Sequence, residues 1–232
     1  ACYTDPQQGS TAAIFAADEL GATKAAVLYN IEDPYSEGLA VAFRDQFAST
    51  GTVTNYEGYT KNDADFKSVL TKIQAQDPDV LFLPDYIAKV GVILAQVKEM
   101  GFDVVCMGGD GWDGIEIDYA DVAEGHYLVN HYAKTDPAEI VQNFISAYEA
   151  KWSKSPNALA ALGYDSTKIM ADAIKRAGTT DSAAVVAALQ ATDMDGVAGH
   201  VTFDENGDPN KSITIIQVIG GEHVVAGKVG GN

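Results

Sequence analysis

The alternation of short apolar runs with amphipathic segments in the first half of the chain constrains its fold more than any other feature. The apolar runs have the length of strands and lie at 25–30, 79–85 and 104–109. Strands that are apolar on consecutive residues are buried on both faces, which is typical of a parallel sheet between two layers of helices. We therefore expect an α/β fold with a doubly wound parallel sheet and flanking helices.

The segments between these runs carry apolar residues at helical spacing. Leu39, Phe43 and Phe47 recur every four residues, which indicates one buried face of a helix. Asp63 stands where the N-cap of the next helix is expected. The pattern predicts helices over 33–51, 63–76 and 86–101, and further strands over 53–60 and 125–132.

The segment after residue 132 changes character, because helical patterns follow one another almost without strand-like runs. Helices are expected over 137–154, 157–178 and 181–192. Their apolar residues include Ile140, Phe144, Leu162, Ile169 and Ile174. Leaving such side chains in water costs about 1.5–3 kcal/mol each, so we expect something to cover them. The tail returns to strands, with a hairpin turn at Asn206 and Gly207 followed by strand runs at 212–219 and 222–227.

The charge of the chain excludes several kinds of partner. Thirty-three acidic residues against 15 basic ones give a formal charge of −18. Nucleic acids and anionic membrane surfaces require a basic footprint, so neither is expected to bind. The first residues lack the order of a secretion signal, and we expect any export signal or lipid anchor to lie outside this sequence. Cys2 and Cys106 are too few for a disulfide framework and are expected as buried thiols.

The sequence contains no motif for a cofactor, a metal or a catalytic group. The stretch "GGDGWDG" has neither the dinucleotide-binding nor the P-loop pattern. An EF-hand loop that began at Asp110 would place Trp112 and Ile115 where an oxygen ligand and a glycine are required. Neither G-x-S-x-G nor H-E-x-x-H spacing occurs. We therefore expect no cofactor, no metal site and no enzymatic activity.

Position in the fold, rather than a motif, indicates a site. Ligands of open α/β sheets bind outside the carboxyl ends of the strands. The residues that follow the predicted strands include Tyr35, Asp85, Tyr86, Asp110, Gly111 and Trp112. A carboxylate among aromatic rings suits a small ligand that carries an ammonium group. By spacing alone the alternative is equally good, namely that the tyrosines start helices and Asp110 is a cap.

Longer stretches carry a resemblance over essentially the whole chain. They are "TDPQQGSTAAIFAADELGATKAAVLY", "YSEGLAVAF", "DFKSVLTKIQAQDPDVLFLPDY", "MGGDGWD", "ALAALGYDSTKIMADAI" and "FDENGDPNKSITIIQV". In this order they resemble the branched-chain amino-acid (Leu/Ile/Val) binding proteins, which are type I periplasmic solute-binding proteins. The resemblance implies two α/β lobes that close on an amino acid and deliver it to the membrane subunits of an ABC permease.

The resemblance also implies site residues. Tyr35 in "YSEGL" and Tyr86 after "LFLP" match tyrosines that close over the ligand. Asp110 and Gly111 match an acidic residue and a glycine, and the acid holds the α-ammonium of the ligand. The neighbours Trp112 and Asp85 are expected to tune the pocket. From the other lobe, Leu159 aligns with a residue that touches the ligand side chain.

The resemblance implies a division of the chain as well. Residues 1–132, with the strands of about 196–232, match the second lobe, and 133–195 match the helical remainder of the first lobe. Family members begin with a further segment that builds most of the first lobe. We therefore expect the helices of 137–192 to meet either a missing N-terminal fragment or a second copy of the chain.

The function expected from these observations is that of an extracytoplasmic solute-binding component of an ABC transporter. Its ligand would be a branched-chain or related amino acid, and its location the periplasm or the cell surface through an anchor outside these residues. Two alternatives stay open. One is a ligand-sensing receptor or regulatory module of the same fold, and the other is a small α/β enzyme, which needs a paired nucleophile and base near Asp110.

Overall fold

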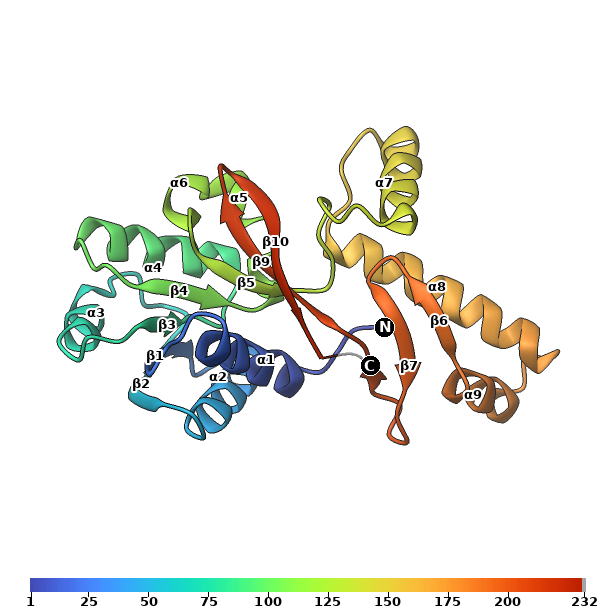
Figure 1. Cartoon of the computed structure of the whole chain (residues 1–232), viewed down its shortest axis with the longest axis horizontal. Helices are drawn as coiled ribbons and strands as arrows, with labels where there is room; N and C mark the ends of the chain where they lie inside the picture. Colours follow the sequence, from blue (N-terminus) through green and yellow to red (C-terminus); the bar gives the residue numbers. More distant parts are fainter. Residues whose placement is uncertain (231–232) are drawn as a thin grey trace. The chain divides into compact units, whose positions relative to one another are not determined.

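The computed structural model describes residues 1–230 and divides into two compact units (Figure 1). The sheet unit comprises Asp5–Asn130 and Ile215–Gly227. The helical unit comprises Ala1–Thr4, His131–Thr214 and residues 228–230. Because each unit combines separate stretches of the sequence, the chain passes between them more than once.

A seven-stranded sheet lies at the centre of the sheet unit, with the strand order β10-β9-β5-β4-β3-β1-β2. Its strands are β1 (Lys24–Asn30), β2 (Thr52–Tyr59), β3 (Val80–Phe82), β4 (Val105–Gly108), β5 (Tyr127–Asn130), β9 (Ile213–Ile219) and β10 (Glu222–Val229). Parallel pairing joins β1 to β2 and β3, β3 to β4, and β4 to β5. The predicted parallel sheet is thus confirmed.

Helices flank this sheet on both faces. They are α1 (Asp5–Asp18), α2 (Pro34–Phe47), α3 (Lys67–Gln74) and α4 (Ile87–Glu99), followed by the short α5 (Ile115–Asp118) and α6 (Ala120–Ala123). Connections between parallel strands are right-handed. The connection from β1 leads to β2 at one edge of the sheet, whereas the connections into β3 and β4 lead toward the other edge. Helix α2 therefore covers one face of the sheet, and α3 and α4 cover the other (Figure 1). The sheet is therefore doubly wound, and its order reverses between β1 and β3.

The core of the sheet unit confirms the predicted helix face. Leu39, Phe43 and Phe47 are fully buried on the inner side of α2. The ring of Phe43 stacks on the ring of Phe82 in β3, with centroids 4.2 Å apart. Truncating a core aromatic of this kind typically costs about 3–5 kcal/mol, so this contact is a main attachment of α2 to the sheet.

Two details of the sequence interpretation are wrong. Helix α3 begins at Lys67, with Phe66 rather than Asp63 as its N-cap. The Asp63 carboxylate instead accepts hydrogen bonds from the backbone nitrogen and hydroxyl of Thr60, at 2.7 and 3.1 Å, and closes the preceding turn. Helix α1 is absent from the sequence prediction, because most of its buried residues are small and give no regular stripe of large apolar side chains.

The helical unit contains three helices and a small antiparallel sheet. The helices are α7 (Glu139–Trp152), α8 (Ala158–Ala177) and α9 (Ser182–Gln190), and the strands are β6 (Asp193–Gly196), β7 (Gly199–Phe203) and β8 (Pro209–Asn210). The predicted turn joins β7 to β8, with Gly207 at a φ of +84°. Sequence reasoning missed β6, because its residues, Asp-Met-Asp-Gly, lack an apolar run.

The β6–β7 hairpin covers part of the helix faces for which no strand was expected. Val197 and Ala198 join a core cluster with Phe144 and Leu162, and Ile169 is also buried. Ile140 and Ile174, in contrast, stay 40% and 37% exposed, and Trp152 is 57% exposed. The expected packing problem is therefore solved within the chain for some of these side chains only.

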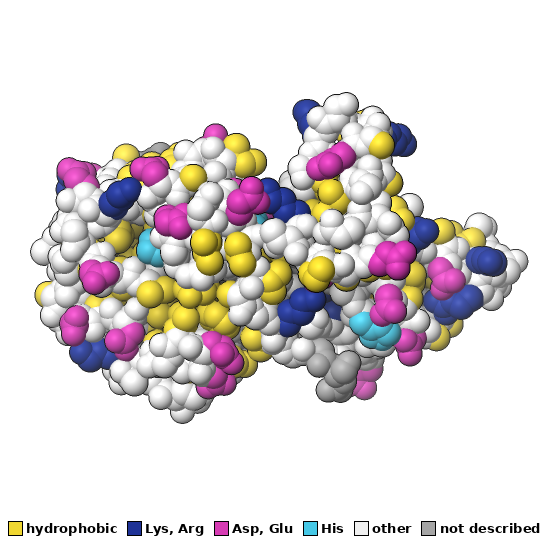
Figure 2. Space-filling model, turned by 45° about the horizontal axis from the view of Figure 1, so that its top comes forward, with side chains coloured by type: hydrophobic (Ala, Val, Ile, Leu, Met, Phe, Trp, Pro, Cys, Tyr) yellow, Lys and Arg dark blue, Asp and Glu magenta, His cyan; other side chains and the backbone are white. Residues whose placement is uncertain are grey.

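Acidic side chains are scattered over the face shown in Figure 2 rather than gathered in one patch. Within residues 1–230, no helix has the length and apolarity to cross a membrane. Cys106 is buried as expected, and neither cysteine forms a disulfide. The expectation of a buried Cys2 is wrong, because the first four residues form no strand and Tyr3, which is 3% exposed, turns inward in its place.

The Asp165 side chain joins the hairpin to helix α8. It is 2% exposed and accepts hydrogen bonds from the backbone nitrogens of Val197 and Ala198, at 2.9 and 2.8 Å. A Cβ on Gly196 would lie 2.6 Å from the Asp165 carboxylate, so a glycine is needed at this close approach. One buried carboxylate thus satisfies both donors of the turn.

Replacing Asp165 by Ala should lower the free energy of unfolding by about 2–4 kcal/mol, because two buried N–H groups lose their acceptor. Denaturant unfolding followed by circular dichroism measures the change. Asp172→Ala, at a more exposed position on the same helix, is the control and should change stability by less than about 0.5 kcal/mol. Equal effects of the two substitutions would contradict this role of Asp165.

Candidate ligand-binding site

The predicted site residues of the sheet unit gather where the strand order reverses. Tyr35 lies in the first turn of α2, which follows β1, and Tyr86 is the N-cap residue of α4, which follows β3. Asp110 begins a short 3₁₀ helix, η1 (Asp110–Trp112), after β4. All three therefore lie beyond the carboxyl ends of neighbouring strands, at the position where open α/β sheets bind ligands.

Local sequence explains the position of Tyr35. The Asp33 side chain caps α2 by accepting hydrogen bonds from the backbone nitrogens of Tyr35 and Ser36, at 2.9 and 3.3 Å. Pro34 occupies the first helical position, where its missing N–H costs nothing. The Tyr35 ring then stacks on the ring of Tyr86, with centroids 5.0 Å apart and planes 25° apart. Half of the Tyr86 surface is exposed.

Asp110 is held by Tyr35 and by a residue that sequence reasoning missed. The Tyr35 hydroxyl donates to Oδ1 of Asp110 at 2.9 Å and accepts from the backbone nitrogen of Gly111 at 2.8 Å. The side-chain amide of Gln8, in the first turn of α1, donates to the same Oδ1 at 3.1 Å. The spacing-based alternative is right that Tyr35 and Tyr86 start helices. Asp110, however, is not a side-chain cap of η1, and it is bonded by Tyr35 and Gln8.

Asp85 is buried beneath the tyrosines. It is 4% exposed, and its carboxylate accepts from the Tyr59 hydroxyl at 2.5 Å and from the backbone nitrogen of Tyr86 at 2.7 Å. These two donors engage both of its oxygens. In this structure Asp85 therefore fixes the backbone at Tyr86 rather than presenting a surface to a ligand.

Trp112 is also part of the interior. Its side chain is fully buried, and its indole nitrogen donates to the carbonyl of Leu83 at 2.9 Å. A Cβ on Gly108 would collide with the indole, so the glycine allows the ring to pack against the end of β4. Trp112 thus anchors the turn that carries Asp110 to the loop after β3.

The electrostatics of the site favour a cation. Partial burial raises the pKa of the Tyr86 phenol, and the negative charges of nearby carboxylates raise it further; these are Asp33, Asp110, Asp85 and Asp5. Burial, and then the charge of Asp110, place the pKa of Tyr35 far above its usual value. Burial likewise raises the pKa of Asp5, with contributions from Asp110 and Asp33. Both tyrosines therefore stay protonated in a region of negative potential.

Leu159 belongs to the other compact unit. It is in the first turn of α8, in the helical unit, and its side chain is 67% exposed. The residues that sequence reasoning missed are Asp5, Gln8, Asp33 and Tyr59. Two of them precede a proline, Asp5 before Pro6 and Asp33 before Pro34, and this dipeptide is a signal for a helix start that could have located them.

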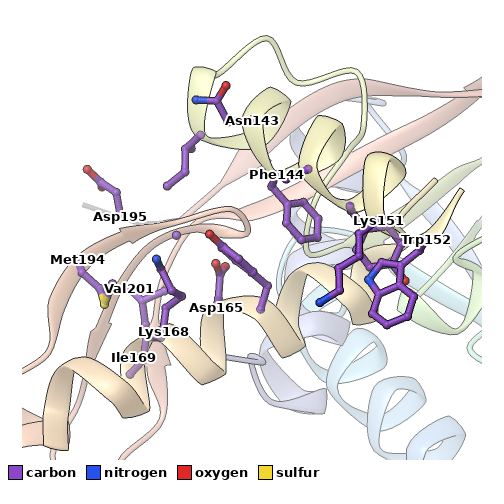
Figure 3. A pocket seen from close by; sticks show the side chains of 15 residues that line it. Asn143, Phe144, Lys151, Trp152, Asp165, Lys168, Ile169, Met194, Asp195 and Val201 are labelled. Carbon is purple, nitrogen blue, oxygen red and sulfur yellow. The ribbon is translucent and has the colours of Figure 1, made fainter. Parts of the chain in front are cut away.

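A cavity of about 540 Å³ lies in the helical unit (Figure 3). Phe144, Lys151 and Trp152 line it from α7, Asp165, Lys168 and Ile169 from α8, and Met194, Asp195 and Val201 from the small sheet. Aromatic and aliphatic side chains dominate its wall, and the Asp165 carboxylate is already bonded to the hairpin. It is the uncovered part of the helix faces described above. The expectation that a further fragment or a second copy covers it stays a prediction.

Comparison with known proteins identifies the family. A family model described as periplasmic binding protein matches residues 1–222. The chain belongs to the periplasmic binding protein family. Its predicted fold class, that of the type I members, agrees with the doubly wound sheet and with the solved structures below.

Several curated members of this family are similar in sequence. The leucine-, isoleucine-, valine-, threonine- and alanine-binding protein of Pseudomonas aeruginosa is 29% identical over 209 residues, which cover 88% of this chain and 55% of that protein. A Leu/Ile/Val-binding protein homologue of Brucella melitensis is 29% identical over 215 residues, with 89% and 57% covered. The chain therefore spans about half the length of the curated relatives it matches.

Solved structures show the same fold. A leucine-binding protein of Thermotoga maritima superposes with a TM-score of 0.90 at 30% identity, covering 99% of this chain and 67% of that one. A branched-chain amino-acid transporter substrate-binding protein of Streptococcus pneumoniae, solved with isoleucine, gives a TM-score of 0.84 at 28% identity, with 98% and 65% covered.

Gly109→Ala should disturb the site, because the new Cβ would collide with the Gln8 amide oxygen and lie 2.6 Å from the Tyr35 hydroxyl. We expect a loss of about 1–3 kcal/mol of unfolding free energy, the usual cost of overpacking. At Gly163, on the exposed side of α8, a Cβ meets nothing within 4 Å. Gly163→Ala should therefore stabilise the chain by about 0.5–1 kcal/mol. Denaturant unfolding compares the two, and a stabilising Gly109→Ala would show that the packing around Asp110 is loose.

Proposed function

We propose that this chain acts in the solute-binding component of an ABC transporter and captures an amino acid outside the cytoplasmic membrane. The observation that carries the proposal is Asp110, a carboxylate oriented by Tyr35 and Gln8 at the reversal point of the sheet, beside an exposed tyrosine ring. Its position is the expected one for a ligand of an open α/β sheet.

The chemistry of the site supports an ammonium group as the part of the ligand that is recognised. In the proposed complex the ammonium pairs with the Asp110 carboxylate, and charge-assisted bonds of this type are about twice as strong as neutral ones. The faces of Tyr35 and Tyr86 attract the same cation. The carboxylates of Asp5, Asp33 and Asp85 add negative potential, which disfavours ligands that carry only negative charge. The names of the relatives direct the choice among amines toward branched-chain and related amino acids.

The proposed roles of the predicted site residues differ. Tyr35, Tyr86, Asp110 and Gly111 form the part of the site that contacts the ligand. The buried Asp85 and Trp112 hold that part in place. Leu159 is proposed as a contact of the ligand side chain.

The proposed partners follow the family. The proposed lobes follow the two compact units, one of Asp5–Asn130 with Ile215–Gly227 and the other of the helices with β6, β7 and β8. Residues 196–214 therefore belong with the helices, and the division expected from the sequence, which joined them to the sheet lobe, is corrected. Ligand binding favours a closed state of the lobes, which the membrane subunits of the permease recognise. The family is described as periplasmic binding protein and the relatives are named as binding proteins, which supports an extracytoplasmic location and a role without catalysis.

Isothermal titration calorimetry tests the proposal. The natural protein that carries these residues is titrated with L-leucine, L-isoleucine and L-valine, and with 2-hydroxy-4-methylpentanoate, which is leucine with a hydroxyl in place of the ammonium. We expect binding of at least one amino acid and at least a hundredfold weaker binding of the hydroxy acid, about 3 kcal/mol. Equal affinities for leucine and the hydroxy acid would contradict ammonium recognition.

Asp110→Asn should weaken amino-acid binding by about 10- to 100-fold, since the loss of a charged hydrogen-bond partner costs about 1.5–3 kcal/mol. The substitution keeps the size of the side chain and removes its charge. Asp118→Asn, an exposed change on α5, is the matched control and should bind as the native protein does. Unchanged affinity of the Asp110 variant would remove this residue from the site.

A further inference from the structure

Gln8 makes two hydrogen bonds to one residue of the site. Its Oε1 accepts from the backbone nitrogen of Asp110 at 2.6 Å, and its Nε2 donates to the Asp110 carboxylate at 3.1 Å. The side chain is 2% exposed, although it belongs to the first turn of a helix at the surface of the sheet unit. A buried glutamine with both ends of its amide engaged is a specific arrangement, since an unsatisfied buried amide is costly.

The two bonds determine which end of the amide faces the carboxylate. A backbone N–H can only donate, so the group opposite the Asp110 nitrogen must be the amide oxygen. The amide NH₂ then necessarily points at the carboxylate, which accepts when it is ionised. A donor bonds an ionised carboxylate more strongly than a neutral carboxylic acid, so the Gln8 amide favours the charged form of Asp110.

We propose that Gln8 is the positioning residue of the ligand site, which holds the Asp110 carboxylate ionised and aimed for an ammonium group. The proposal rests on the proposed function for its ligand. It adds a residue and a physical role that the sequence patterns do not indicate.

The glycines next to Asp110 support this role. A Cβ on Gly109 would collide with the Gln8 oxygen, and a Cβ on Gly111 would lie 2.9 Å from the Tyr35 hydroxyl and 2.8 Å from the Asp85 carbonyl. The "GGDG" stretch therefore leaves space for two neutral donors, Gln8 and Tyr35, to reach the same oxygen of Asp110.

Neutral donors solve a specific electrostatic problem. In addition to burial, the charges of Asp110 and Asp33 raise the pKa of Asp5, and the charges of Asp33, Asp110, Asp85 and Asp5 raise the pKa of Tyr86, so these carboxylates act on the same surroundings. An arginine or lysine in the place of Gln8 would stabilise the charge but also neutralise the attraction for a cationic ligand. An amide stabilises the ionised carboxylate by hydrogen bonding and leaves the charge of the site unchanged.

The first test does not need a ligand. The carboxyl carbon of Asp110 is followed by ¹³C NMR from pH 7 downward in the unliganded protein, with Asp110→Asn used to assign the signal. Gln8→Met keeps the length of the side chain and removes the amide. Loss of a donor favours the protonated form, so the titration midpoint should rise by about 0.5 pH units or more. Gln76→Met, at an exposed glutamine of the same unit, should leave it unchanged.

A second variant separates positioning from folding. Gln8→Glu keeps an oxygen for the Asp110 backbone nitrogen but replaces the donor with a negative charge, so the midpoint should rise further than in Gln8→Met. If Gln8→Met fails to fold, Gln8→Glu decides the question by itself. A midpoint that stays within about 0.2 units of the native value in a folded Gln8 variant overturns the proposal, since no donor to the carboxylate was then lost.

The third measurement uses L-leucine as the probe. Gln8→Met should weaken its binding by about tenfold or more, and the acid limb of the affinity–pH curve should shift to higher pH. A purely structural role would lower stability without shifting this limb. If the native protein binds no amino acid, the proposed function fails, whereas the NMR titration still decides the role of Gln8 toward Asp110.

Discussion

The structure around the site depends on one topological constraint, the reversal of strand order between β1 and β3. The right-handed connections after β1 and β3 run over opposite faces of the sheet. Neither α2 nor α4 therefore covers the space beyond the carboxyl ends of these two strands. The first residues of α2 and α4 lie in this space, and the turn after β4 lies there as well. Tyr35, Tyr86 and Asp110 therefore meet without being close in sequence.

Hydrogen bonds then fix the positions of these side chains. Asp33 fixes the start of α2, Asp85 fixes the backbone at Tyr86, and Gln8 with Tyr35 fixes Asp110. Three of these residues, Asp33, Asp85 and Asp110, are carboxylates that accept from uncharged backbone, hydroxyl or amide donors. Carboxylates can in this way gather at one edge of the sheet unit while each of the three has hydrogen-bond donors.

The sequence predicts the main sheet well because the apolar residues of its strands and helices recur at regular spacing. Continuous apolar runs identify β1, β3 and β4, and the four-residue spacing of Leu39, Phe43 and Phe47 identifies the buried face of α2. Helix α1 and strand β6 escape this reasoning. The first buries mostly small residues, and the second is polar and is held by Asp165 from a distant helix.

The sequence predicts where the candidate site lies, but it does not predict which of its residues are accessible to a ligand and which are buried supports. Strand ends point to Tyr35, Tyr86 and Asp110, whereas burial is a tertiary property that spacing does not reveal. Trp112 and Asp85, which spacing alone places beside a ligand, are interior residues that hold the turn and the loop. Gln8 is 102 positions away from Asp110, and only the fold brings the two together.

The placement of the two tryptophans has a practical consequence. The chain holds only Trp112 and Trp152, one sealed in the sheet unit and the other 57% exposed in the helical unit. A buried indole emits at shorter wavelength than one in water, so intrinsic fluorescence carries two separable signals. The blue side of the emission reports on the turn behind Asp110, and the red side reports on the uncovered face of α7.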